Sequence, residues 1–152
     1  MSTSPEHRFE LGTDGPKTLV VGVDGSTTSL RAGAYAAGLA RRQGAHLVVV
    51  YVARPAVLVG MAPGAVAAVR QASDELADDL RRQVDEAVAE IGLRATFRAL
   101  SGDPYSELVR VADEISADGV IVGASTQAGH RFAGSIAIRL VKAGRWPVTV
   151  VP

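Results

Sequence analysis

The sequence predicts one α/β domain in which a five-stranded parallel sheet is doubly wound, that is, covered by helices on both faces. Short runs rich in valine and isoleucine alternate with longer amphipathic segments, and this alternation is typical of parallel strands joined by crossover helices. The first two apolar runs are continuous, as expected for strands buried on both faces. A length of 152 residues fits one domain.

The first predicted unit is a strand at residues 18–24, a helix, and a strand at residues 46–53. Ser26 or a threonine after it can cap the helix, and Gly44 can end it. The helix has apolar positions at three- and four-residue spacing, which we expect to form its buried stripe. These positions are Leu30, Ala34, Ala37 and Ala40.

The second half of the chain continues the alternation. A long amphipathic helix is predicted over residues 63–92, and "LRATFRAL" after it alternates like a strand. Asp103 as N-cap and Pro104 as first helical residue predict a third helix. "GVIVGAS" and "PVTVVP" supply two more strands, which flank a helix at about residues 135–142. The predicted strand order is 3-2-1-4-5.

In this order the strand sequence reverses between the first and fourth strands, and ligands bind beyond the carboxyl ends of the strands at such a point. These two strands end at Asp24 and Gly123. A ligand can approach the backbone closely at a glycine, and a helix opening at Gly134-Ser135 favours an anion through its free N–H groups and dipole. Two interpretations stay open, because Gly123 can also make a simple turn and Asp24 can also cap the next helix.

Composition narrows the class of protein. Lys+Arg and Asp+Glu both number 16, so the chain has no net charge to attract nucleic acid. It has no cysteine, and no apolar run has the length of a membrane span, which together predict a cytoplasmic protein. We expect residues 1–16 to form a loose tail before a domain at residues 17–152.

Catalytic patterns are not found in the sequence. It contains no G-x-x-x-x-G-K-[ST] phosphate loop and no G-x-S-x-G nucleophile elbow. Its three histidines are scattered without metal-ligand spacing. We therefore assign no catalytic residue and no metal ligand.

Three segments resemble, in order, the signature regions of the universal stress protein family. They are "VVGVDGSTTSLRAGAYAAGLA", "GDPYSELVRVADEISADGVIVGAS" and "GSIAIRLVKAGRWPVTVV", and they span most of residues 20–151. The resemblance implies a small cytoplasmic doubly wound α/β domain that acts in stress response through partner proteins. It also implies a homodimer formed through the last strand, residues 148–151, and binding of ATP with Mg²⁺ or of another adenine nucleotide.

The resemblance also implies roles for individual residues. Asp24 would face the adenine and ribose, and the Val52 backbone would lie beside adenine. Gly123 would be the first glycine of the ATP loop, and we expect Gly123→Val to abolish nucleotide binding while the fold is retained. The nucleotide-binding residues implied in this way are Asp24, Val52, Val122, Gly123, Thr126, Gly134, Ser135 and Ile136.

The loop after Gly123 departs from the pattern G-x2-G-x9-G-[S/T] of the ATP-binding branch. Thr126 stands where the second glycine belongs, and the segment to Gly134 is two residues shorter. His130 and Arg131 lie in this loop and could meet phosphate oxygens. Two alternatives therefore stay open beside nucleotide binding: a dimeric interaction protein that does not bind ATP, and a weak ATPase.

Overall fold

The computed structural model describes residues 15–55, 61–125 and 135–152 of the chain. Strands and helices alternate along these residues, as predicted. In chain order they are β1 (Thr18–Val23), α1 (Thr27–Gln43), β2 (His46–Ala53), α2 (Pro63–Ile91), β3 (Ala95–Ser101), α3 (Pro104–Glu114), β4 (Gly119–Gly123), α4 (Ser135–Ala143) and β5 (Val148–Val151). The predicted tail falls mostly on residues 1–14, which lie outside the described residues.

The strands form one five-stranded sheet with the order β3-β2-β1-β4-β5. All four neighbouring pairs are parallel, so the predicted fold class is confirmed. β1 pairs with β2 on one side and with β4 on the other. The Asp118 carboxylate before β4 accepts the Lys17 and Thr18 backbone N–H groups at 2.8 and 2.9 Å, which helps to fix β4 beside β1.

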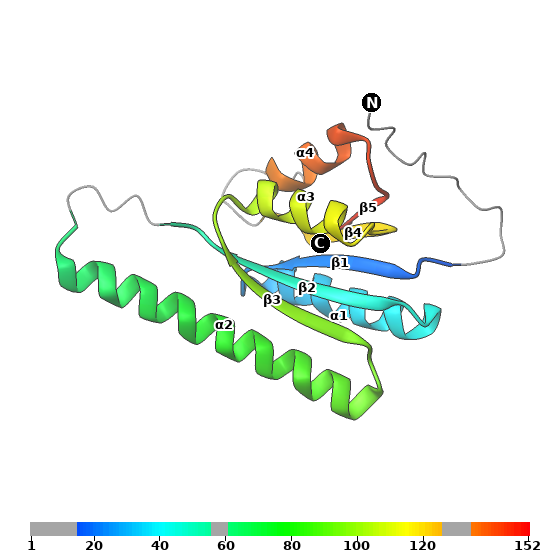
Figure 1. Ribbon diagram of the computed structural model, residues 1–152, viewed down its shortest axis with the longest axis horizontal. Helices are drawn as coiled ribbons and strands as arrows, with labels where there is room; N and C mark the ends of the chain where they lie inside the picture. The colour runs from blue at the N-terminus through cyan, green and yellow to red at the C-terminus, as the bar shows by residue number, and fades with distance from the viewer. Residues whose placement is uncertain (1–14, 56–60, 126–134) are drawn as a thin grey trace.

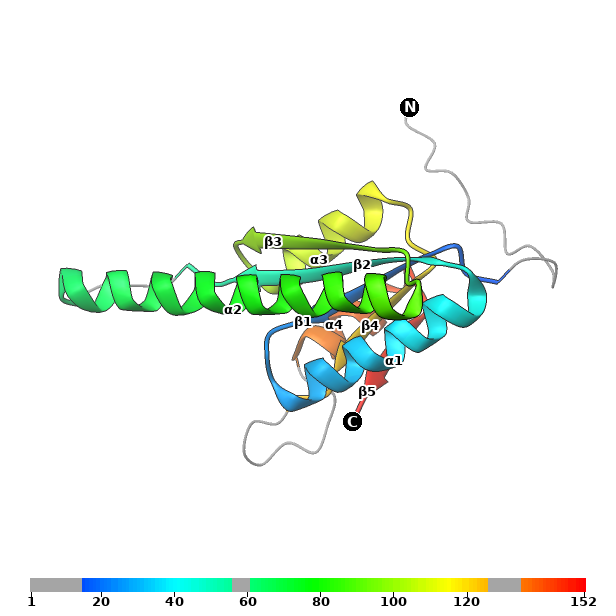
Figure 2. The same cartoon turned by 90° about the horizontal axis from the view of Figure 1, so that it is seen from below.

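Helices cover both faces of the sheet (Figures 1 and 2). α1 and α2 pack on one face, where Leu19, Val21 and Val23 of β1 point. α3 and α4 pack on the other face, with Val20 of β1 and Leu140 of α4 in its core. β1 therefore buries side chains on both faces, which explains its continuously apolar sequence.

α1 begins and ends as predicted, but its buried stripe differs from the prediction. Ser26 is the N-cap, and Gly44 ends the helix with φ 63°. Ala32, Ala36 and Ala40 are fully buried, whereas Leu30 is 41% exposed. Ala34 is exposed as well, so the predicted stripe was wrong for two of its four members. The small side chains at four-residue spacing let α1 lie close to the sheet, and that close approach selected the buried face.

α2 is a long helix of 29 residues that packs mainly through its middle. Leu80 is its fully buried residue, while Val69, Val88 and Ile91 are each at least 38% exposed. Figure 1 shows its first turns extending beyond the carboxyl ends of the strands. Its surface is rich in charged residues, and none of the described helices is both long and apolar enough to span a bilayer.

Candidate nucleotide site

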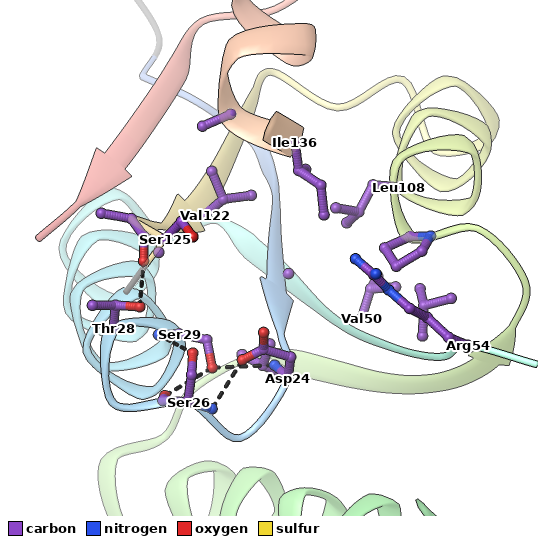
Figure 3. A pocket seen from close by; sticks show the side chains of 17 residues that line it. Asp24, Ser26, Thr28, Ser29, Val50, Arg54, Leu108, Val122, Ser125 and Ile136 are labelled. Carbon is purple, nitrogen blue, oxygen red and sulfur yellow. Dashed lines mark hydrogen bonds between the residues drawn. The ribbon is translucent and has the colours of Figure 1, made fainter. Parts of the chain in front are cut away.

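A crevice of about 480 Å³ opens at the carboxyl ends of β1, β2 and β4 (Figure 3). It lies at the point where the strand order reverses, which is where the sequence predicted a ligand site. Strand ends form its floor through Gly22, Val50 and Val122. The start of α1 forms one wall, and α3 with α4 forms the wall opposite. We call these the α1 wall (Asp24, Ser26, Thr28 and Ser29) and the α3/α4 wall (Pro104, Leu108, Ile136 and Ala137).

Asp24 stands at the rim of the crevice in a turn held by hydrogen bonds. The Ser26 backbone N–H donates to Asp24 Oδ1 at 2.9 Å, and the Asp24 backbone N–H donates to Ser29 Oγ at 3.1 Å. The Ser29 N–H in turn donates to Ser26 Oγ at 3.3 Å, which caps α1. Figure 3 shows the second carboxylate oxygen of Asp24 directed toward the crevice. The N-cap of α1 is thus Ser26 and not Asp24, so the expectation that Asp24 caps the helix was wrong. Asp24 instead holds the turn before α1 through the Ser26 N–H and presents an acceptor to the crevice.

The pKa of Asp24 lies below its ordinary value of 3.8. Partial burial acts to raise this pKa, but hydrogen bonding by Ser26 and Ser29 together lowers it by more. The carboxylate is therefore ionised at neutral pH. An ionised carboxylate accepts hydrogen bonds and does not donate them, so this rim selects ligand groups that carry N–H or O–H donors.

Gly123 is needed for a reason that differs from the prediction. A Cβ at this position would lie 2.6 Å from the Ser29 backbone nitrogen and 2.7 Å from the Thr28 carbonyl oxygen. Both are backbone atoms of α1, which cannot move aside as a side chain can. Gly123 lines the crevice, but its lack of a side chain makes room for α1. The expectation that Gly123→Val abolishes nucleotide binding stays a prediction, and the contact with α1 adds the expectation that this variant also loses stability.

A second short contact joins the end of β4 to α1. The Thr28 hydroxyl donates to the Ala124 carbonyl at 2.6 Å, across 96 residues of sequence. Thr28 is buried, and the Ala124 N–H donates to the Val151 carbonyl at 2.8 Å. The first residue after β4 is thus tied to α1 and to β5, and the direction in which the chain leaves β4 is fixed by these two bonds.

The predicted site residues fall into three groups. Five of them line the crevice: Asp24, Val52, Val122, Gly123 and Ile136. Ser135 is the first residue of α4, whose N-terminus faces this end of the sheet. Thr126 and Gly134, together with His130 and Arg131, lie outside the described residues.

Several crevice residues were not predicted from the sequence, among them Arg54, Pro104 and Leu108. Arg54 follows β2 directly, and Figure 3 shows its guanidinium directed toward the crevice. Its sequence signal was a cation just beyond a strand that ends at the predicted site. Leu108 and Ile136 face each other in Figure 3 and close the α3/α4 wall. Within the described residues, no group of three or more His, Asp or Glu side chains could hold a metal ion.

These features define a small doubly wound α/β protein with a ligand-sized crevice at the switch point of its sheet. The sequence model of the universal stress protein family matches residues 16–152. The chain therefore belongs to the universal stress protein family. A universal stress protein of Methanocaldococcus jannaschii is 29% identical over 138 residues, which cover 89% of this chain and 81% of that protein.

Solved structures show the same fold. A universal stress protein family member from Burkholderia pseudomallei is 28% identical, with a TM-score of 0.67, and the match covers 90% of this chain and 96% of that one. A universal stress protein solved in complex with cAMP is also 28% identical, with a TM-score of 0.66 and coverage of 90% and 97%. The likeness thus extends over nearly the whole length of each protein.

Proposed function

We propose that this protein is a regulatory module that binds an adenine nucleotide in the crevice between β1 and β4 and acts in stress response through partner proteins. The observation that carries the proposal is the crevice itself, which combines an apolar floor and an apolar α3/α4 wall with an ionised carboxylate at the switch point. A structural relative of 28% identity that was solved in complex with cAMP supports it.

The two kinds of surface in the crevice suit the two parts of a nucleoside. Val50, Val52 and Leu108 supply an apolar surface for the flat face of adenine. The carboxylate of Asp24 accepts a hydrogen bond from a ribose hydroxyl or from the adenine amino group. The phosphate would lie toward the N-terminus of α4, where the positive end of the helix dipole favours negative charge.

Ligand identity is tested by thermal unfolding of protein that is first shown to carry no co-purified nucleotide. A ligand at a hundred times its Kd stabilises by about 2.7 kcal/mol, which raises the Tm of a domain of this size by about 5–10 °C. The ligands are ATP with Mg²⁺, ADP, AMP, cAMP and adenosine. A shift with any of them supports the crevice as an adenine site. No shift with all five would contradict the proposal.

Asp24→Asn separates recognition from folding. The amide oxygen of asparagine still accepts the Ser26 N–H, so the turn is retained, but the atom facing the crevice becomes a donor. We expect the affinity for adenosine and for nucleotides to fall at least about tenfold, since a hydrogen bond to a charged group contributes about 1.5–3 kcal/mol. Unchanged affinity in this folded variant would exclude Asp24 from the site.

The proposal includes a homodimer formed through β5, residues 148–151. β5 is an edge strand, and Ile138 and Val141 of the adjacent α4 are 41% and 58% exposed. The backbone carbonyls of Pro147 and Val151 bond to β4, so by alternation the Val150 N–H lies on the outer edge.

Proline at residue 150 tests the dimer because it removes this outer donor. We expect the mass in solution, from light scattering across a range of concentrations, to fall from dimer to monomer in Val150→Pro. Val150→Ala keeps the N–H and loses a comparable amount of side-chain packing, so it is the matched control and stays dimeric. A wild-type protein that is monomeric at all concentrations would contradict the proposal.

A further inference from the structure

A second compartment of about 410 Å³ adjoins the crevice between the chain after β2, the start of α3 and the start of α4. Three residues, Arg54, Pro104 and Ile136, line both spaces, so the compartment is a continuation of the crevice. Two arginines from different parts of the fold meet here: Arg54 follows β2, and Arg139 lies on α4. The remaining polar side chain is that of Asp103, the N-cap of α3.

Arg139 is held in place by an aromatic ring. Its guanidinium carbon lies 3.8 Å from the centre of the Tyr105 ring, which fixes the plane of the group and leaves its N–H edge available. Arg139 is four residues after Ser135, so it lies on the same face of α4 as the first residue of the helix. The cationic group and the positive end of the helix dipole are therefore adjacent.

The compartment is positively charged. Neither Arg54 nor Arg139 forms an ion pair with another residue in the described part of the chain. Asp103 is the one acidic residue that lines the compartment, and its Oδ2 accepts both the N–H and the hydroxyl of Ser106, at 2.9 and 2.8 Å. Two guanidinium groups thus face one carboxylate that is already engaged by its own helix.

The pKa of Asp103 agrees with this arrangement. Hydrogen bonds from Ser106 lower it most, and the charges of Arg139 and Arg54 lower it further. Both arginines are thus near enough to Asp103 to affect its ionisation. They reach the compartment from β2 and from α4, so both line the space that an anion would occupy.

We infer that Arg54 and Arg139 bind the phosphate of the nucleotide seated in the crevice. Their positive charges would stabilise the phosphate beside the N-terminus of α4. The inference rests on the proposed function. A guanidinium presents parallel N–H donors that match two phosphate oxygens, and Arg is suited to this role for that reason. Adenosine lacks the phosphate, so these cations should contribute little to its binding.

The test compares AMP with adenosine in Arg54→Gln, Arg139→Gln and the double variant. The control is Arg81→Gln, since Arg81 also lies over a ring, that of Phe97 at 5.2 Å, but on α2 away from the crevice. Isothermal titration gives the Kd values. We expect each single variant to bind AMP about tenfold more weakly, since each loses a charge-assisted bond. Adenosine should bind all variants within twofold of wild type, and Arg81→Gln should match wild type for both ligands.

The salt dependence of AMP binding gives a second measurement. The AMP affinity of wild type should fall between 50 and 500 mM NaCl, and the double variant should lose most of that dependence. Arg139→Lys keeps the charge and loses the planar fork, so it should bind AMP between wild type and Arg139→Gln. Thermal unfolding of each variant without ligand checks that the fold is retained.

The outcomes distinguish the inference from the proposed function. If wild type binds adenosine and AMP and both glutamine variants keep the wild-type Kd for AMP, the inference is wrong and the proposed function stands. If wild type binds neither ligand, the proposed function fails, and titration with inorganic pyrophosphate decides the inference. If wild type binds pyrophosphate and the double variant does not, the two arginines form an anion site. If wild type does not bind pyrophosphate, the inference is wrong.

Discussion

The two walls of the crevice are built in different ways. The α1 wall is fixed by backbone contacts: Gly123 lies against Thr28 and Ser29, and the Thr28 hydroxyl bonds to Ala124. The α3/α4 wall consists of side chains such as Leu108 and Ile136, with exposed arginines at its outer end. Backbone contacts tolerate little displacement, whereas side chains can change rotamer. The α1 wall therefore holds one geometry, whereas the side chains of the α3/α4 wall can rearrange.

The largest loss of stability is expected at Gly123, where the α1 wall leaves no room for a side chain. Gly123→Val should destabilise the protein by about 3 kcal/mol or more, because its side chain would overlap α1 backbone atoms. The corresponding fall in Tm is about 6–12 °C. Gly38→Ala is the control, because a Cβ on this α1 glycine meets nothing within 4 Å. It should raise stability by about 0.5–1 kcal/mol. A Gly123→Val protein as stable as wild type would show that the two elements are not closely packed.

A smaller effect is expected from Thr28→Val, which keeps the shape of the side chain and removes the hydroxyl. The Ala124 carbonyl then loses a buried donor at 2.6 Å, and we expect a loss of about 1–3 kcal/mol in urea unfolding. Thr28→Ser keeps the hydroxyl and should recover most of this loss. Equal stability of the valine and serine variants would mean that the bond contributes little.

Removing a side-chain contact on the α3/α4 wall should lower the free energy of unfolding by less. Tyr105→Leu removes the ring under Arg139, and stability should fall by only about 0.5–1 kcal/mol, as for other exposed cation–π pairs. The Kd for AMP should rise less than in Arg139→Gln, since the charge is still present. If Tyr105→Leu destabilised the protein more than Thr28→Val, the contrast between the walls would be wrong.

The smallest expected effect is the pH dependence of stability that comes from Asp24. The folded protein holds the pKa of Asp24 below 3.8, so the ionised carboxylate stabilises the fold above that pH. This contribution is lost as pH falls through the lowered pKa. The stability difference between wild type and Asp24→Asn should therefore shrink between pH 5 and pH 2. We expect the change to be small because Asp24 is exposed and screened by solvent. A difference that grows on acidification would contradict the pKa direction.

The fold could be predicted because local signals agreed with one another. Each helix start carried its own signal, such as Ser26 for α1 and Asp103 followed by Pro104 for α3. The ends of the strands then placed Asp24 and Gly123 at one edge of the sheet without any knowledge of tertiary contacts.

The details of the site could not be predicted, because they depend on contacts between distant segments. The Thr28 to Ala124 bond joins residues 96 positions apart, and nothing near either residue indicates the other. The packing role of Gly123 was missed for the same reason, since the atoms that a side chain would strike belong to α1. Leu30 was expected inside because it is apolar, but small residues fit the narrow space between α1 and the sheet.

The position of β1 beside β4 has a consequence for biosynthesis. Their pairing brings together Leu19 and Gly119, so the floor of the crevice joins chain that leaves the ribosome early to chain that leaves it late. Until β4 has emerged, the nascent polypeptide has Asp24 but neither Gly123 nor α4 to complete the pocket around it. A chain that ends before β4 therefore cannot form this crevice, and the site is complete only in the finished, folded domain.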